Sequence, residues 1–298
     1  MKSLRMALFE LSAAVRTRRA LVLVVLYLAT SLLGMSGAIS ALGKMEEQLA
    51  DILHVERVEG RSGVVSAALW KSKPFQRLAR GVVGDSPVYD DIVGKHPAEL
   101  IYAWIVFLAV PFLSVLVASR RVADDVKSGA AKYVLQRVTR LEWTLGKYIG
   151  QALLMLVGLL LGAFAAWGVA VWRLSGADLP ALLPAMAVWS LKAWFLSLAW
   201  LGIALGISHL FKSGSKADLA SVAALVAFAV LPRVLAAYAD SPVWSHLQVL
   251  SRVFPSTIED SLWRASFLPV ADAALWLVFV GLFWLSIGHA VFAGRDVR

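Results

Sequence analysis

The sequence of 298 residues contains no cysteine. Disulfide bonds, thiolate nucleophiles and cysteine-ligated zinc are therefore excluded, and the redox environment of the protein stays undetermined. Charge is also scarce, because charged residues make up 16% of the chain and apolar residues make up 59%. A soluble domain of ordinary composition carries more charge and fewer apolar residues than this. The composition therefore indicates a protein that resides in a membrane.

Motifs of nucleotide and metal binding are missing as well. There is no Gly-x-x-x-x-Gly-Lys-Ser/Thr phosphate cradle, so we expect no nucleotide contact from this chain. The five histidines are scattered and no His-Glu-x-x-His occurs, which gives no support for a metal site. We therefore expect no catalytic residue, no metal and no cofactor in this chain.

Six apolar blocks are present, each close to the length of about 20 residues that a helix needs to cross a bilayer. They are Ala20 to Leu42, Leu100 to Ser119, Tyr148 to Trp172, Ala185 to Phe211, Leu219 to Tyr238 and Ala273 to Phe292. No Ala-x-Ala cleavage pattern follows the first block, so we interpret it as a retained span and expect the mature protein to start near Met1. The sequence predicts an all-α integral membrane protein with six transmembrane helices.

Lysine and arginine gather on one side of the predicted membrane. That side holds Lys2, Arg5, Arg16, Arg18, Arg19, Arg120, Arg121, Lys127, Lys132, Arg137, Arg140, Lys147, Lys212, Lys216, Arg295 and Arg298. The opposite flanks have only Arg173, Arg252 and Arg264, apart from the long segment 43–99 of mixed charge. Because translocation of positive charge is disfavoured, both termini are predicted to be cytoplasmic. The net charge of +9 then reflects contact with membrane lipid, and no nucleic-acid partner is expected.

The predicted organisation is a cytoplasmic amphipathic helix at 1–19 and a membrane domain at 20–298, with an extracytoplasmic insertion at 43–99 and a cytoplasmic loop at 120–147. The N-terminal helix has an apolar face at helical spacing, formed by Leu4, Leu8, Leu11 and Val15. Such a helix lies along the inner membrane surface. Five tryptophans near the block ends are interpreted as anchors in the headgroup layer. They are Trp104, Trp167, Trp172, Trp189 and Trp276.

Short helices are also predicted outside the membrane. In the insertion, amphipathic patterns cover Met45 to Leu53 and Val64 to Arg80. After the fifth block, an apolar stripe runs from Val243 to Phe254. Ser256 and Glu259 follow at the spacing of a capping box, which predicts that a helix begins there.

The cytoplasmic loop carries the densest polar pattern. Asp124, Asp125 and Gly129 precede an amphipathic run, and Thr139 with Glu142 then has the spacing of a second capping box. In such a box the Thr139 hydroxyl accepts from the N–H of residue 142 while the Glu142 carboxylate accepts from the N–H of residue 139, so the third membrane helix begins there. From the residues alone, this loop either docks a soluble partner or is simply solvated.

The loop has a recognisable pattern. Residues 122–129 read Val-Ala-Asp-Asp-Val-Lys-Ser-Gly, and they are followed by Leu135, Arg140 and Leu145-Gly146-Lys147. This pattern resembles the cytoplasmic loop of the ABC type-2 exporter permeases. Phe9-Glu10-Leu11 before the first span and Gly294-Arg295-Asp296-Val297 after the last support the resemblance. The chain departs from the family at Ala130 and Val138, where a threonine and a proline are common.

The resemblance implies the membrane-spanning permease subunit of an ABC exporter in a bacterial cytoplasmic (inner) membrane. It further implies that the N-terminal helix and the segment Asp124 to Arg140 contact a separate ATPase subunit, which binds ATP and Mg. That ATPase would reorient a dimer of two permeases, either two copies or one copy and a homologue. The coupling interface it implies consists of Glu10, Asp124, Asp125, Gly129, Arg137, Thr139, Arg140, Glu142, Gly146 and Lys147.

Two basic residues lie inside predicted spans. Lys192 is about eight residues into the fourth block, and Arg233 is near the outer end of the fifth. Charge buried in lipid costs about 2.5 kcal/mol or more, so such side chains face the bundle interior or extend to the membrane surface. For Arg233, near the end of its block, extension to the membrane surface is the favoured interpretation, whereas Lys192 is deeper and suits a translocation path or a subunit contact equally well. If both Lys192 and Arg233 line a translocation path, an anionic or zwitterionic amphiphile would suit them.

Other functions remain open at this level. An ion-coupled secondary transporter would account for Lys192. A rhomboid-like intramembrane serine protease would use Ser36, which lies in a Gly-x-Ser-Gly motif, and His289 as its base. However, Ser36 lies in the first span, where small residues commonly serve helix packing. In a third alternative, the ATPase moves an outer partner through the insertion and nothing is exported.

Overall fold

The computed structural model describes residues 2–16, 18–53, 76–77, 87–174, 179–237 and 253–294. Within these residues, six helices are long and apolar enough to cross a membrane. They are α2 (Arg18–Leu53), α6 (Pro97–Ala118), α9 (Arg140–Arg173), α10 (Leu179–Leu210), α11 (Gly214–Ala237) and α14 (Phe267–Ala293). The shorter helices are α1 (Lys2–Arg16), α5 (Pro87–Ile92), α7 (Arg121–Lys127), α8 (Ala130–Leu135) and α13 (Pro255–Leu262). The prediction of an all-α membrane protein with six spans is confirmed.

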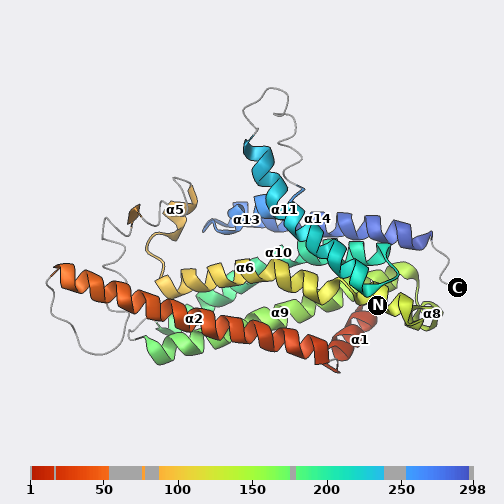
Figure 1. The fold of residues 1–298 in the computed structure, drawn as a ribbon, viewed down its shortest axis with the longest axis horizontal. Helices are drawn as coiled ribbons and strands as arrows, with labels where there is room; N and C mark the ends of the chain where they lie inside the picture. The colour runs from red at the N-terminus through yellow and green to blue at the C-terminus, as the bar shows by residue number, and fades with distance from the viewer. Residues whose placement is uncertain are drawn as a thin grey trace.

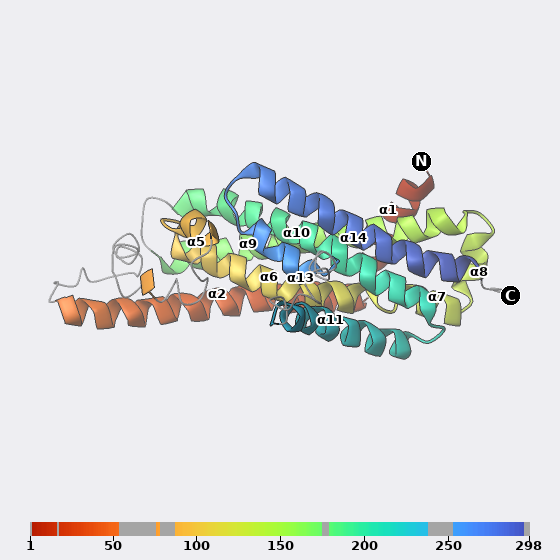
Figure 2. The same cartoon turned by 90° about the horizontal axis from the view of Figure 1, so that it is seen from above.

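The spans form an elongated bundle whose two ends differ (Figure 1). At one end, here called the basic end, lie α1, α7, α8 and the end of α14. At the other, here called the insertion end, lie α5 and the C-terminal end of α2. Figure 2 shows the same separation from above, with the start of α1 and the end of α14 on the same side. The helical loop 120–147 is thus placed far from α5.

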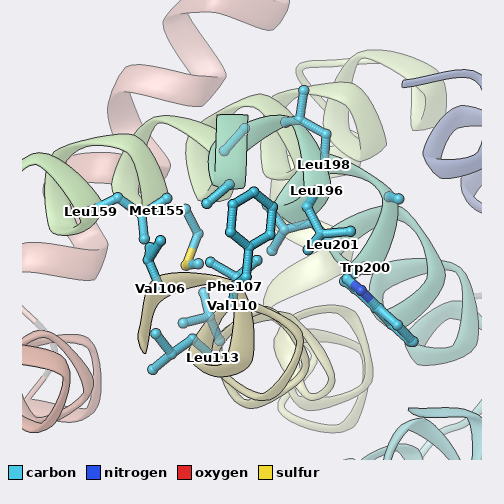
Figure 3. Close-up of a cluster of buried hydrophobic side chains, with 14 of the residues drawn as sticks. Val106, Phe107, Val110, Leu113, Met155, Leu159, Leu196, Leu198, Trp200 and Leu201 are labelled. Atoms are coloured by element: carbon cyan, nitrogen blue, oxygen red, sulfur yellow. The ribbon is translucent and has the colours of Figure 1, made fainter. Parts of the chain in front are cut away.

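α10 is the central span and the most buried of the six, whereas α11 is the least buried. α10 meets α14 so closely that a Cβ atom on Gly202 would collide with the backbone of Gly281. Small residues at such a crossing allow two backbones to approach within the membrane. On its other sides, α10 packs against α6 and α9. Figure 3 shows Phe107 of α6, Met155 of α9 and Leu196 of α10 in this buried cluster.

Two predicted helices outside the membrane differ from expectation. α2 runs without a break through the predicted end of the first span to Leu53, so the amphipathic pattern from Met45 to Leu53 extends a spanning helix. α13 forms near the predicted position, but it begins at Pro255 and has no side-chain cap. The prediction that Ser256 caps α13 was wrong, because its hydroxyl donates to the Phe228 carbonyl oxygen of α11 at 2.8 Å. The pattern at 64–80, apart from 76–77, and most of the stripe at 243–254 lie outside the described residues.

Candidate functional site

The most buried charge at the basic end is Lys147 of α9, whose side chain is 2% exposed. Its ammonium nitrogen lies 2.8 Å from Oε1 of Glu10 on α1 and 2.7 Å from Oδ2 of Asp125 on α7. It also lies 5.1 Å from the centre of the Trp143 ring. A buried charge is tolerated only when it is paired, so this geometry holds α1 and α7 against α9.

α1 packs closely on α9 beside this ion bridge. A Cβ atom on Gly150 would collide with Cβ of Glu10 and would press on the Ala7 carbonyl oxygen. Met6, Ala7 and Glu10 form the buried face of α1, whereas Leu8 and Phe9 are more than half exposed. α1 therefore presents one face to α9 and leaves a second, apolar face uncovered in the described residues. Leu8 was predicted on the apolar face; the side chains of Leu4 and Val15 are outside the described set.

The start of α7 is anchored to α10. Ser208 Oγ accepts hydrogen bonds from the backbone N–H groups of Val122 and Ala123, both at 3.2 Å. The first N–H groups of any helix lack partners within the helix. Here a side chain from another span supplies the missing acceptor, so α7 is fixed to α10 as well as to α9.

The junction of α6 and α7 is tied to α11. Ser119 Oγ donates to Oδ1 of Asp218 at 2.5 Å, and Arg120 Nε forms an ion pair with the same carboxylate. The first residue of α11, Gly214, lies so close to Asp124 that a Cβ atom there would collide with its carboxylate. The start of α11 is therefore in direct contact with α7, and its position depends on where α7 lies.

The rest of the loop has the geometry that its sequence predicted. Gly129 adopts φ +77°, a left-handed conformation that favours glycine, and it separates α7 from α8. The predicted capping box is present, because the Glu142 N–H donates to Thr139 Oγ1 at 3.2 Å and the Thr139 N–H donates to Glu142 Oε2 at 2.9 Å. Arg140 donates to the Phe292 carbonyl oxygen at 2.8 Å, so it satisfies a free carbonyl group at the end of α14.

The ten residues predicted for the coupling interface thus gather at the basic end, in two layers. Glu10, Gly146 and Lys147 are buried between helices, whereas Asp124, Arg137 and Thr139 are exposed. Sequence reasoning missed Ser208 and Asp218, which lie in other spans and have no local signal. It also left Tyr133 of α8 unassigned, although this side chain is 73% exposed. A large aromatic residue on a short polar helix was the available signal.

The candidates for a translocation path are not brought together. Lys192 lies toward the insertion end, where its ammonium donates to the Arg264 carbonyl oxygen at 2.9 Å and lies 4.3 Å from the centre of the Trp189 ring. Arg233 is exposed near the end of α11, beside α13. Within the described residues, no contact joins the two side chains.

Trp189 is the centre of a polar and aromatic cluster at the insertion end. Its indole N–H donates to Glu99 Oε1 at 2.8 Å, and Lys95 forms an ion pair with the same oxygen at 3.2 Å. The Trp263 ring packs 5.1 Å from the Trp189 ring. The interpretation of Trp189 as an anchor in the headgroup layer was wrong, since the residue is 1% exposed. Trp189 lies inside the bundle because its indole N–H is the hydrogen-bond donor for the buried carboxylate of Glu99.

α13 carries an acidic pair with altered titration. The pKa of Glu259 is raised to about 7, mainly by burial and also by the neighbouring Asp260, while Arg233 opposes the shift. Burial also raises the pKa of Asp260. These carboxyl groups therefore ionise at a higher pH than free side chains do.

The geometry excludes the serine protease alternative. Ser36 Oγ accepts from Arg173 at 2.8 Å, whereas His289 Nδ1 lies 3.1 Å from Thr144 Oγ1. Thr144 and Arg173 lie near opposite ends of α9, about 40 Å apart at 1.5 Å per residue. A general base must lie within hydrogen-bond reach of its nucleophile. Ser36 and His289 therefore cannot form a catalytic pair.

Comparison with known families agrees with the loop pattern. A family model described as "ABC-2 family transporter protein" matches residues 4–244. The match includes most of α1, the loop 120–147 and all of α11. A comparison with curated proteins gives no match.

Proposed function

Since the chain belongs to the ABC-2 transporter family, we propose that it is the permease subunit of an ABC exporter whose ATPase is a separate chain. In this proposal the basic end lies in the cytoplasm of a bacterium and the bundle crosses its inner membrane. ATP and Mg bind to the ATPase, and the permease pairs with a second copy or with a homologue. The permease itself carries no catalytic residue.

The buried bridge of Lys147 to Glu10 and Asp125 carries this proposal. A force applied to α1 or α7 reaches α9 through one paired ammonium group. Because separating a buried ion pair is strongly unfavourable, the three helices move together. Ser208, Asp218 and Arg140 extend the same connection to α10, α11 and α14.

The exposed layer supplies the surface for the ATPase. Asp124, Lys127, Tyr133 and Arg137 all face solvent along α7, α8 and the turn that follows. An exposed tyrosine surrounded by charged residues has the composition of an interface hot spot. The buried layer behind it then transmits the movement of the docked subunit.

A pull-down of the tagged chain tests the two layers separately. We expect wild type to retain an ATPase subunit and a variant with Asp124→Lys, Tyr133→Ala and Arg137→Glu to lose it, because these side chains are exposed. The matched control is Asp272→Lys, an exposed charge reversal at the start of α14. Because Asp124 also contacts Gly214 of α11, the double variant Tyr133→Ala, Arg137→Glu is tested as well, and it and the control should unfold at the temperature of wild type.

Two results would contradict the proposal. If the surface variant retained the ATPase as well as the control does, the exposed layer would not be the docking surface. If wild type retained no ATPase, an ion-coupled secondary transporter would become the better description.

A further inference from the structure

Among the buried polar atoms without a hydrogen-bond partner in the described residues, three lie along one face of α11. They are the indole nitrogens of Trp200 on α10 and Trp284 on α14, and the hydroxyl oxygen of Ser221 on α11. Each donor comes from a different span. Native proteins leave few buried donors unpaired, because each one has lost its hydrogen bonds to water. Three such donors around one helix therefore call for a partner that the described residues do not supply.

The three donors share an aromatic wall. The Phe228 ring of α11 lies 6.3 Å from the Trp200 ring and 5.4 Å from the Trp284 ring. Phe254 continues the wall, 5.2 Å from Phe228. Ser221 lies on the same face of α11, two turns closer to the basic end, or about 10 Å along the helix. We call these five residues the aromatic strip.

Trp200 is a buried member of the core cluster, and its ring lies beside Phe228 of this strip. Figure 3 shows its ring directed away from the part of the cluster that lies between α10, α6 and α9. The Trp194 indole on the same helix shows the ordinary arrangement, because its N–H donates to the Ala152 carbonyl oxygen at 2.7 Å. An unpaired buried indole also occurs at Trp143 of α9, so the strip is distinguished by three unpaired atoms from three spans that lie along one helix.

α11 is the less buried wall of the strip; polar contacts hold it at its start, through Asp218, and at Phe228, whose carbonyl oxygen accepts from Ser256. It is the least buried span, and toward its C-terminal end it leaves the axis of the bundle (Figure 1). The opposite wall is fixed, since Gly202 of α10 and Gly281 of α14 are in backbone contact. A small outward shift of α11 would therefore expose all three donors without disturbing the contact of α10 with α14.

The three helices that line the strip carry few charged residues, and this limits the kind of ligand that could bind there. α11 carries no Asp, Glu, Lys or Arg between Asp218 and Arg233, and α10 carries none after Lys192. α14 carries none from Ala273 to its end. Around the two indole nitrogens a charged group would therefore be strongly disfavoured, whereas a neutral oxygen could accept from the indole N–H groups.

We propose that the aromatic strip is a binding site for an elongated, uncharged, apolar molecule with carbonyl oxygens. The acceptors would take hydrogen bonds from the Trp200 and Trp284 N–H groups at one level and from the Ser221 hydroxyl about 10 Å away. The hydrocarbon part would lie against Phe228 and Phe254. The site does not depend on the coupling function, because binding at the strip needs no ATPase.

The test measures the indole N–H groups directly. The full chain, labelled with ¹⁵N at tryptophan Nε1, is prepared in maltoside detergent, and each resonance is assigned by a single Trp→Phe change. Methyl laurate is the probe, and tetradecane is the control that has similar length but no oxygen. We expect methyl laurate to shift the Trp200 and Trp284 resonances downfield, while tetradecane leaves them in place and the Trp194 resonance responds to neither.

Three outcomes would overturn the proposal. Equal shifts with methyl laurate and tetradecane would show filling of apolar space without hydrogen bonding. No shift with either probe at saturation would indicate that the N–H groups already point at an aromatic ring such as Phe228. Fast exchange of both indole protons with D₂O before any probe is added would show that water occupies the strip.

Substitutions provide an independent check. The double variant Trp200→Phe, Trp284→Phe removes both N–H donors and keeps aromatic rings in place. We expect it to bind methyl laurate about tenfold more weakly. Each Trp→Phe change lowers stability by the ring volume that it removes, but the changes at Trp200 and Trp284 break no hydrogen bond within the described residues. Trp194→Phe should bind methyl laurate normally and be less stable. Unchanged affinity of the double variant would contradict the site.

Discussion

The two ends of the bundle are held together by different chemistry. At the basic end, one ammonium group, that of Lys147, joins three helices through two carboxylates. At the insertion end, Trp189 is surrounded by several partners, which include a carboxylate, two lysines and the rings of Phe107 and Trp263. Removal of that charge breaks the ion pairs to α1 and α7 at once, although the contacts of Gly150 with α1 and of Ser208 with α7 stay in place. A connection shared among many contacts loses only a part, so the basic end should be the more sensitive of the two.

The largest expected effect follows from Lys147→Met. This change leaves Glu10 without a partner in a buried site, whereas Asp125, which is 35% exposed, keeps contact with water. Breaking a buried pair costs about 3–5 kcal/mol. We expect a large drop in the thermal unfolding temperature in detergent. The control is Lys127→Met on α7, an exposed lysine whose loss should have little effect.

Neutral partners should reverse most of this loss. In the triple variant Lys147→Met, Glu10→Gln, Asp125→Asn, no buried charge is left without a partner, and replacing a whole buried ion pair is often nearly neutral. Equal unfolding temperatures for Lys147→Met and Lys127→Met would refute the idea that the basic end depends on one charge.

A smaller effect is expected for Trp189→Phe at the insertion end. The change removes the N–H donor of Glu99 but keeps the ring contacts and the Lys95 ion pair. Loss of one hydrogen bond to a charged group costs about 1.5–3 kcal/mol. The measurement is again thermal unfolding, with Trp172→Phe as the control because Trp172 is 77% exposed. A loss as large as that of Lys147→Met would remove the contrast between the two ends.

The smallest effect should be a pH dependence located on α13. Glu259 has a pKa of about 7 in the folded protein and 4.5 as a free side chain. Because the folded state holds this proton more tightly, stability is greatest below about pH 4.5 and falls as the pH rises to about 7. Wild type should therefore unfold at a higher temperature at pH 5 than at pH 8. Glu259→Gln should reduce that difference, and an unchanged pH profile in this variant would contradict the assignment to Glu259.

Local sequence signals predicted the parts of this molecule that depend on neighbours in the chain. The six spans follow from the length of the apolar blocks, and the start of α9 follows from the spacing of Thr139 and Glu142. Ser256 and Glu259 have the same spacing, yet Ser256 is bound to the Phe228 carbonyl oxygen of α11. A residue pattern cannot say whether a carbonyl group from a distant helix will compete for a hydroxyl.

The sequence predicted many of the polar residues of the candidate site, but not which of them are in contact with one another. Glu10, Asp125 and Lys147 were all assigned to one interface by family resemblance, without any indication that they touch one another. Ser208 and Asp218 had no signal at all, since a single polar residue near the end of a span is common. Trp189 was assigned to the membrane surface because it lies near the end of an apolar block. Its hydrogen bond to Glu99, a residue far away in the sequence, could not be read from that position.

By itself, the sequence determined that this protein is a helical bundle in a membrane, because blocks of apolar residues of spanning length have no other stable environment. Its loop pattern also indicated the transporter family. Only the tertiary structure decided which charges are paired, which donors are left unpaired and which span is loosely held. These properties depend on contacts between helices far apart in the chain, and low dielectric surroundings make each such contact decisive.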